Sequence, residues 1–172
     1  MREGHTSPFE SAVAQFEIEV PIFVAREWMR HRTFSYSELS LRYSLAEPEF
    51  YLTPTNRPLV NEGNGAHPKL VRTKDSEMPF EVQGIQRWGI RESWERYESL
   101  VELGVANEVA RNVLPVSIFT KFQATGNLHN WLHFLDLRLG DNALWEFKIV
   151  ARQVKNHLAE KFPITLAAWS VA

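Results

Sequence analysis

The sequence predicts an α+β fold in which an antiparallel sheet packs against long helices. Two stretches, residues 12–20 and 116–124, alternate apolar and polar side chains, which is typical of strands that are buried on one face. Residues 81–103 instead repeat apolar side chains mostly every three or four positions, as an amphipathic helix does. A further long helix is predicted at residues 143–162, where Pro163 ends it before a short apolar tail.

The first strand leads directly into a short helix. Pro21 stands where a helix would begin, a position that accommodates proline well, and an apolar run at residues 22–29 fills the helix. Residues 47–79 follow with five prolines and a cluster of Asn and Gly, without clear periodicity. We predict a long loop there, and loops of this length are usually mobile or functional.

The amphipathic helix at residues 81–103 ends at Gly104. We expect its stripe of Trp and Tyr side chains to lie in the core. A second, shorter helix is predicted at residues 106–113. It carries Glu108 and Arg111 three positions apart, a spacing that predicts a weak surface ion pair between them.

The second strand, residues 116–124, is expected to end at Gly126. Asn127 is a favourable helix N-cap, because its side-chain oxygen can accept a hydrogen bond from a free N–H of the first turn. The helix that it begins is predicted to run to Leu139, and Gly140 is expected to end it.

Size and composition predict one domain and exclude several classes of function. The chain has 172 residues, 44% of them apolar and 23% charged, enough for a single domain over residues 1–172 with its own core. A net charge of −2 excludes a broad basic surface for nucleic acid. There are no cysteines, so disulfides and a thiol nucleophile are excluded. Without a signal peptide or a membrane-length apolar run, we expect a cytoplasmic protein that does not bind membranes.

Residues 30–43 stand out because they are polar almost throughout. The stretch is more polar than a core segment, and we expect it in a loop outside the core. An arginine presents a rigid fork of donors that matches phosphate oxygens, so the stretch predicts an anion site, most simply for phosphate. Alternatively, the Arg-His-Arg triplet at 30–32 only complements a helix dipole. That role does not require the second polar group, Glu38, Ser40 and Arg42, which favours a site.

A metal site is a competing hypothesis. His129 and His133 lie four positions apart and would share a helix face with Asp136, and two imidazoles with a carboxylate can bind zinc or iron. This arrangement would suit a metal-dependent hydrolase. Because the sequence indicates no third strong ligand with its supporting contacts, we predict no metal. The glycine motifs of dinucleotide and P-loop sites are also absent.

The triplet Arg30-His31-Arg32, followed by Ser37-Glu38-Leu39-Ser40-Leu41-Arg42-Tyr43, resembles the signature of flavin-dependent thymidylate synthases, the ThyX family. Four other segments match the family in the same order, which argues against chance. These segments are residues 4–10, 21–28, 108–115 and 127–138. Family members usually have a strand and helices ahead of the motif that begins here at Gly4, so we expect a shortened N-terminus.

The resemblance implies an α+β homotetramer that methylates deoxyuridylate (dUMP) to dTMP. Methylenetetrahydrofolate would donate the methylene group, and FAD reduced by NADPH would supply the hydride, without a cysteine nucleophile. The family's substrate site is assembled across subunits. The residues that match its dUMP contacts are Glu27, Arg30, Glu38, Ser40, Leu41, Arg42, Arg111 and Arg138.

Arg138 is the catalytic residue that the resemblance implies, and it would come from a neighbouring subunit together with Arg111. A guanidinium beside the uracil N3 would stabilise the deprotonated ring and make C5 more nucleophilic, while Arg42 and Ser40 suit the phosphate. The positions that match the family's FAD contacts are Ser7, Arg30, His31, Arg32, Glu38, Asn127, His129 and His133. A non-catalytic nucleotide-binding protein of the same fold is the alternative.

Overall fold

The computed structural model describes residues 5–65 and 68–169, so Gly4, at the start of the N-terminal motif, lies outside the described residues. The chain forms two compact units. Unit 1 comprises residues 1–18, 26–37 and 122–172, and unit 2 comprises residues 19–25 and 38–121.

Strands and helices are both present, which confirms the predicted α+β class. Unit 1 contains the helical elements η1 (Ser7–Phe9), α4 (Leu128–Leu139), α5 (Trp145–Lys161) and α6 (Pro163–Trp169). Unit 2 contains β3 (Val60–Asn61), β4 (Leu70–Val71), α2 (Met78–Glu102), α3 (Asn107–Ala110) and η2 (Arg111–Val113). Four elements have residues in both units, namely β1 (Val13–Pro21), α1 (Ile22–Trp28), β2 (Ser35–Glu38) and β5 (Phe119–Asn127).

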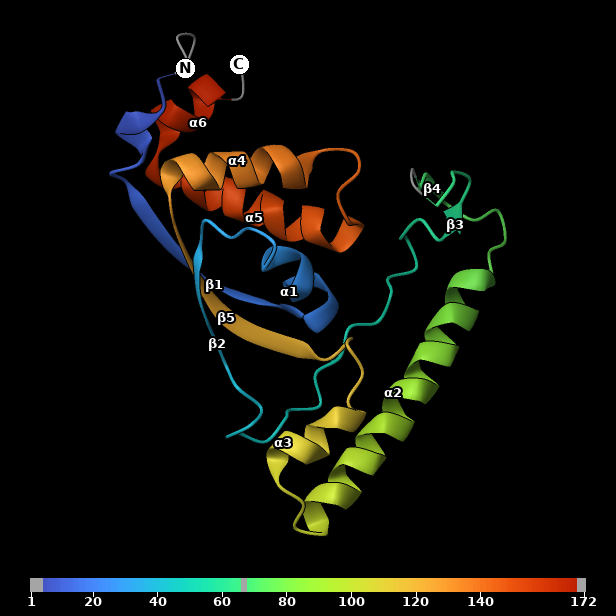
Figure 1. Ribbon diagram of the computed structural model, residues 1–172. Coiled ribbons are helices and arrows are strands. Elements are labelled where there is room, and N and C mark those ends of the chain that lie inside the picture. The colour runs from blue at the N-terminus through green and yellow to red at the C-terminus, as the bar shows by residue number, and fades with distance from the viewer. Residues whose placement is uncertain (1–4, 66–67, 170–172) are drawn as a thin grey trace. The chain divides into compact units, whose positions relative to one another are not determined.

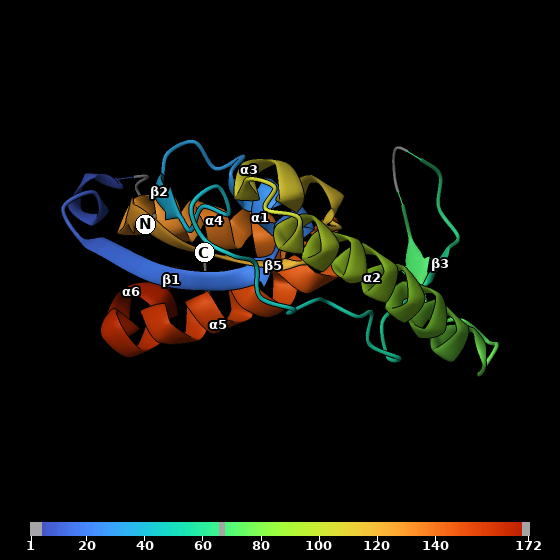
Figure 2. The ribbon, with the colours of Figure 1, turned by 90° about the horizontal axis from the view of Figure 1, so that it is seen from below.

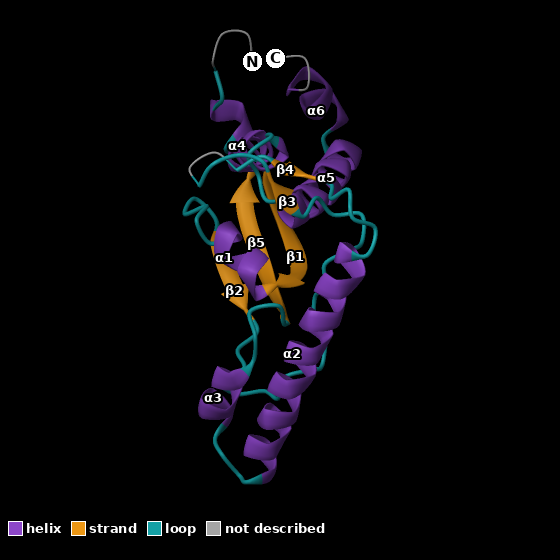
Figure 3. Ribbon diagram, turned by 90° about the vertical axis from the view of Figure 1, so that its right-hand side faces the viewer, coloured by secondary structure: helices purple, strands orange, loops and turns teal. Residues whose placement is uncertain are grey.

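The three longer strands form one sheet in the order β1-β5-β2, with β5 between the other two (Figure 3). The pairing of β1 with β5 is antiparallel, because Gln15 contacts Thr125 at 2.8 Å while Ala12 accepts a 2.8 Å hydrogen bond from Leu128. Along β1, Ile18 is buried and the neighbouring Glu17 is exposed, which confirms the half-buried strand.

The boundaries of β5 differ from the prediction, which placed a strand at residues 116–124. Ile118 N donates to Pro115 O at 3.1 Å, and this turn delays the start of the strand to Phe119. The strand also continues through Gly126 to Asn127. The prediction that Gly126 ends the strand was therefore wrong.

Gly126 has a packing role instead. A Cβ built at this position would lie 2.5 Å from Cε1 of Phe34, and the Phe34 ring is itself packed edge-on against Trp131 at 4.5 Å between centroids. Glycine is required because any side chain would occupy the space of this ring.

Replacing Gly126 with alanine is expected to lower the free energy of unfolding by about 2 kcal/mol, because overpacking a filled core forces side chains to shift. Urea unfolding followed by circular dichroism measures this change. Gly84→Ala in α2 is the matched control, since its Cβ would meet nothing within 4 Å, and there alanine should stabilise the helix by up to about 1 kcal/mol. Equal losses in both variants would contradict this explanation.

The core of unit 1 is built from aromatic rings around Trp28, at the end of α1. The Trp28 ring lies 5.6 Å from Phe122 of β5, 4.8 Å from Phe134 of α4 and 4.9 Å from Phe147 of α5, measured between centroids. Helices α4 and α5 lie side by side (Figure 1). As predicted, Asn127 caps α4, its side chain accepting from Asn130 N at 2.9 Å, and Gly140 ends the helix.

The described part of the predicted apolar tail is helical, while residues 170–172 of that tail lie outside the described residues. Pro163 does end α5, but it also stands at the first position of α6, so the residues from Ile164 to Trp169 are helical rather than a simple tail. Proline lacks the N–H that a first helical turn leaves unpaired, and its φ angle suits that position. Leu166 of α6 is buried.

Unit 2 is organised around the long helix α2, which ends at Glu102, and Gly104 stops it as predicted. Gly104 has a φ of 76°, a left-handed conformation that favours glycine. The prediction that the aromatic stripe of α2 lies in the core was only partly correct. Tyr97 is buried and its hydroxyl accepts from Ala46 N at 2.9 Å, but Trp88 is 64% exposed and Ile85 is 71% exposed.

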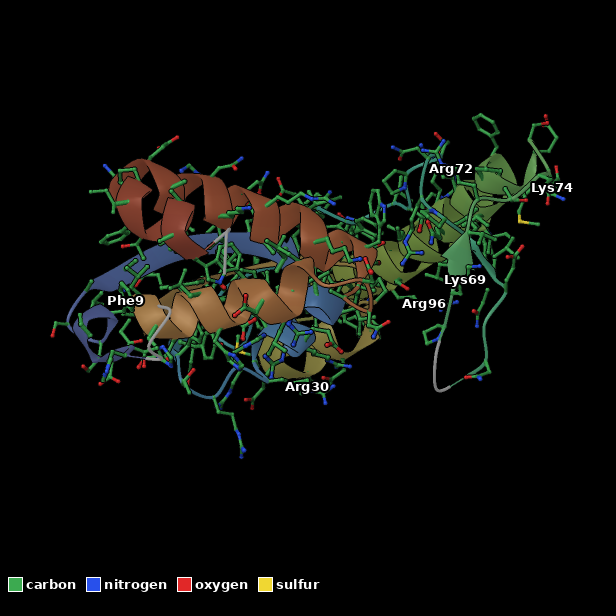
Figure 4. The ribbon with its side chains drawn as sticks, turned by 90° about the horizontal axis from the view of Figure 1, so that it is seen from above. Phe9, Arg30, Lys69, Arg72, Lys74 and Arg96 are labelled. Carbon is green, nitrogen blue, oxygen red and sulfur yellow. The ribbon has the colours of Figure 1, made fainter. Side chains whose placement is uncertain are left out.

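The described part of the predicted loop at residues 47–79 is irregular apart from a small hairpin, but the last two residues belong to α2, which begins at Met78. In the hairpin, β3 and β4 pair antiparallel, Val60 with Val71, and the hairpin lies near the N-terminal end of α2 (Figure 2). Lys69, Arg72 and Lys74 gather around the hairpin (Figure 4). Among the described residues, no helix is both long and apolar enough to cross a membrane.

Candidate functional site

The polar stretch at residues 30–43 is not a loop throughout, and part of it is buried. Residues 35–38 form β2, and the prediction missed this strand because its side chains are mostly exposed and polar. His31 is 8% exposed and Phe34 is 7% exposed. The expectation that the stretch is too polar for the core was therefore wrong for these two residues, which pack among aromatic rings.

Arg138, in the last turn of α4, donates hydrogen bonds from all three nitrogens of its guanidinium. Its Nε donates to Nε2 of His31 at 2.7 Å. Its Nη1 donates to the Glu27 carboxylate at 3.3 Å, and its Nη2 donates to the Glu27 main-chain carbonyl at 3.1 Å. The guanidinium also lies 4.7 Å above the centre of the Phe147 ring. The side chain, 16% exposed, is thus held on several sides.

These contacts leave a defined set of free donors. A guanidinium has five N–H groups, and among the described residues Arg138 uses one on Nε and one on each terminal nitrogen. One N–H on Nη1 and one on Nη2 remain. These two N–H groups can donate to acceptor atoms of a planar ligand or an anion.

The electrostatics of the cluster follow from burial. Burial, the charge of Arg138 and then His133 lower the pKa of His31 to about 4, so the imidazole is neutral at pH 7. Burial also raises the pKa of Tyr36 to about 12, against a lowering effect of Arg138. The neutral Tyr36 hydroxyl contacts the main-chain oxygens of Trp28 at 3.0 Å and His31 at 2.9 Å. For Arg138, burial lowers the pKa, and Glu27 opposes that shift.

The other predicted site residues of unit 1 differ in exposure and in their partners. Arg30, beyond the end of α1 (Figure 4), is exposed and lies 3.9 Å from the Glu27 carboxylate. Arg32 and Ser7 are exposed, and on α4 His133 is exposed while His129 is half-buried. The side chain of Asn127 is already used as the N-cap of α4.

Unit 2 holds the remaining predicted residues. Arg42 donates from Nε and Nη2 to one oxygen of Glu108, both at 2.9 Å. The predicted pair between Glu108 and Arg111 was therefore wrong, because a partner distant in sequence takes the carboxylate. The Ser40 hydroxyl oxygen accepts from Arg42 N at 3.3 Å, and Thr120 donates to Glu38 at 2.6 Å.

Two further predicted residues lie in the same unit. Leu41 lines a hollow of about 300 Å³, together with Thr120 and Lys121. Arg111 is half-buried in η2.

The structure gives no support to the metal hypothesis. Asp136 accepts a 2.9 Å hydrogen bond from the indole nitrogen of Trp169, so a partner other than the two histidines engages it. Within residues 5–65 and 68–169, no group of three His, Cys, Asp or Glu side chains is placed to hold a metal ion.

Sequence reasoning missed Phe147 and Tyr36 as supporting residues. Phe147 forms one wall of the Arg138 site, and Tyr36 fixes the backbone at Trp28 and His31. Phe147 is a typical core aromatic by sequence, and neither residue carries a local signal of its contact with the cluster. Tyr36 could have been noticed only because it lies inside the polar stretch.

The α+β fold carries a candidate site for an anionic or planar ligand, the largely buried Arg138 guanidinium that Glu27 and His31 hold. A family model described as thymidylate synthase complementing protein matches residues 1–164. The flavin-dependent thymidylate synthase of Thermus thermophilus is 40% identical over 169 residues, covering 98% of this chain and 60% of the relative. The chain belongs to the Thy1 family of thymidylate synthase complementing proteins, which confirms the resemblance.

Other relatives agree with this assignment. The flavin-dependent thymidylate synthase of Thermosipho africanus is 38% identical over 98% of the chain and 73% of the relative. The crystal structure of the UMP/dUMP methylase PolB from Streptomyces cacaoi, bound with 5-Br UMP, matches with a TM-score of 0.96 and 33% identity. That match covers 99% of this chain and 78% of PolB. The chain spans about 60% of the length of the Thermus relative.

Proposed function

We propose that this chain is a thymidylate synthase that converts dUMP to dTMP with methylenetetrahydrofolate as the methylene donor. Bound FAD, reduced by NADPH, would supply the hydride. Membership of the Thy1 family and the names of its relatives support this proposal. The observation that carries it is Arg138, a largely buried guanidinium that Glu27 and His31 hold with two N–H groups free for a ligand.

The proposed role of Arg138 follows from those two N–H groups. They match a uracil edge that presents N3 and a carbonyl oxygen, and the positive charge there stabilises the ring after N3 loses its proton. The negative charge spreads to C5 and makes this carbon more nucleophilic toward the methylene donor. The chain has no cysteine, so it cannot activate the uracil ring by adding a thiol to it. Stabilisation of the deprotonated ring by Arg138 takes the place of that thiol adduct.

The phosphate is assigned to Arg42 and Ser40. Arg42 gives two N–H groups to Glu108, and three remain for phosphate oxygens, while the Ser40 hydroxyl supplies a neutral donor. The proposed dUMP site is completed by Glu27, Arg30, Glu38, Leu41 and Arg111. We further propose that Arg111 and Arg138 serve the site of a neighbouring subunit.

The residues proposed to bind FAD supply the positive charges and hydrogen-bond donors that its pyrophosphate and ring system would need. Arg30 and Arg32 present exposed cations, which suit a pyrophosphate, and His129 and His133 add imidazole donors one turn apart on α4. Ser7, Glu38 and Asn127 complete the proposed set. His31 stands apart, because Arg138 already donates to its Nε2.

We also propose a single domain over residues 1–172, a homotetramer with sites shared between subunits, and a cytoplasmic location. The match of the family model to residues 1–164 supports the single domain. The motif resemblance to the family supports the tetramer and the shared sites.

UMP is a second candidate substrate, because PolB, a UMP/dUMP methylase, matches this chain with a TM-score of 0.96. UMP and dUMP differ only at the ribose hydroxyl. The proposed phosphate and uracil contacts are common to both, so a direct competition between the two nucleotides is needed.

The first experiment is a visible absorption spectrum of the purified protein after incubation with FAD, followed by titration with dUMP and, separately, UMP. We expect flavin bands that shift with dUMP, NADPH oxidation that depends on folate, and release of tritium from C5-labelled dUMP. Ethylenediaminetetraacetate should have no effect on turnover.

Each other outcome points to a different function. Binding of dUMP without NADPH oxidation would favour the non-catalytic nucleotide-binding protein. Turnover of UMP as fast as dUMP would assign the broader substrate range. A protein that binds neither FAD nor dUMP would contradict the proposal, and inhibition by the chelator would revive the metal-dependent hydrolase.

A further inference from the structure

We infer that His31 is a positioning residue, whose neutral imidazole accepts a hydrogen bond from Arg138 and aims the guanidinium before substrate binds. This inference deepens the proposed thymidylate synthase function and rests on it. It gives His31 a role other than the direct flavin contact that its motif suggests.

The protonation state of His31 follows from the donor that it meets. A guanidinium can only donate, so Nε2 of His31, 2.7 Å from Nε of Arg138, must carry a lone pair. The ring proton therefore lies on Nδ1 and the imidazole is neutral. A protonated His31 would place an N–H against the Nε–H of Arg138 and break the contact.

The surroundings of His31 hold the ring in this orientation. Three aromatic rings enclose it, with centroids 5.0 Å away at Phe134, 6.2 Å at Phe34 and 6.4 Å at Phe147. Its main-chain N–H donates to Trp28 O at 2.9 Å, and its carbonyl accepts from the Tyr36 hydroxyl at 2.9 Å. Both the ring and the backbone of His31 are thus fixed by groups other than Arg138.

The positively charged groups near the imidazole of His31 oppose its protonation, and the Glu27 carboxylate is the negative group beside them. From α4, Arg138 and His133 both lower its pKa, and the exposed Arg30 lies beside Glu27. Glu27, at the end of α1, contributes the negative charge, but its carboxylate is engaged by Nη1 of Arg138. Tyr36 from β2 is neutral, and α5 contributes the Phe147 ring.

This arrangement matters because a free arginine side chain is flexible. With Nε fixed by His31 and the terminal nitrogens by Glu27, the guanidinium is held in one orientation before a ligand arrives. Binding then does not have to order the side chain, which favours affinity. Loss of the His31 acceptor should leave the charge in place but allow the fork to rotate.

The test compares His31→Gln, whose side-chain oxygen can reach the position of Nε2, with His31→Leu, which fills similar space without an acceptor. We expect His31→Leu to raise the dissociation constant for dUMP by about tenfold or more, as for loss of a hydrogen bond to a charged group. His31→Gln should stay within about threefold of the wild type. His157→Gln, on the exposed face of α5, is the matched control and should be unchanged.

A second measurement needs no nucleotide and separates this inference from the proposed function. Nitrogen NMR of the histidine rings should give His31 an unprotonated Nε2 and a titration near pH 4, and Arg138→Met should move that titration upward. Equal loss in both His31 variants, unchanged binding in His31→Leu, or a protonated Nε2 would overturn the inference. If the wild type binds no dUMP, the proposed function fails while the NMR result still decides the role of His31.

Discussion

Replacing Arg138 with alanine is expected to reduce tritium release from C5-labelled dUMP by at least about 100- to 1000-fold, the effect of removing one donor that stabilises a developing negative charge. Without the guanidinium, nothing among its described neighbours can take its place beside N3, because Glu27 is an acceptor and His31 presents a lone pair. The loss should appear in the rate of turnover at saturating dUMP.

The fold should survive this change, because Trp28 packs against Phe122 and Phe134 as well as against Phe147, the ring that the Arg138 guanidinium covers. Circular dichroism and thermal unfolding test that point. Arg152→Ala is the matched control, since Arg152 is an exposed arginine on the neighbouring helix α5, and its tritium release should equal that of the wild type. Arg138→Lys keeps the charge but not the fork, and its activity should stay low. Full activity in either Arg138 variant would exclude the proposed role.

Stability is expected to fall as the pH is lowered from about 6.5 to about 4, because the pKa of His31 is lowered to about 4 in the folded protein. The unfolded chain, with an ordinary histidine, binds a proton over this interval while the folded protein does not, so protons favour unfolding. The His31 contribution is fully present above pH 6.5 and is lost progressively toward pH 4. Its size is at most about 3 kcal/mol.

Urea unfolding of the wild type and of His31→Gln at several pH values measures this contribution. Other histidines and the carboxylates titrate in both proteins, so the difference between the two curves isolates His31. We expect the wild type to lose more stability than the variant between pH 6.5 and 4. If the difference in unfolding free energy between the two proteins stayed constant across that interval, the pKa of His31 would be the same in the folded and the unfolded protein, and the prediction would be wrong.

Much of the fold could be predicted from sequence because the signals are local. Asn127 and Gly140 bound α4 as predicted, since a cap depends on hydrogen bonds within one helical turn. The alternation along β1 likewise gave the buried face correctly. The predictions failed where a residue serves a different purpose from the one that its type usually indicates. Gly126 makes room for the Phe34 ring instead of ending the strand, and Trp88 lies on an exposed face of α2 instead of in the core.

By itself, the sequence determined the α+β class, the main helices and the family, and it singled out Arg138 and the stretch at residues 30–43. Only the tertiary structure decided which of these side chains meet. Arg138 lies 107 residues from His31, and Glu108 pairs with Arg42, 66 residues away, rather than with Arg111. Such contacts depend on how the chain folds back on itself, and periodicity and caps report only on neighbours along one element.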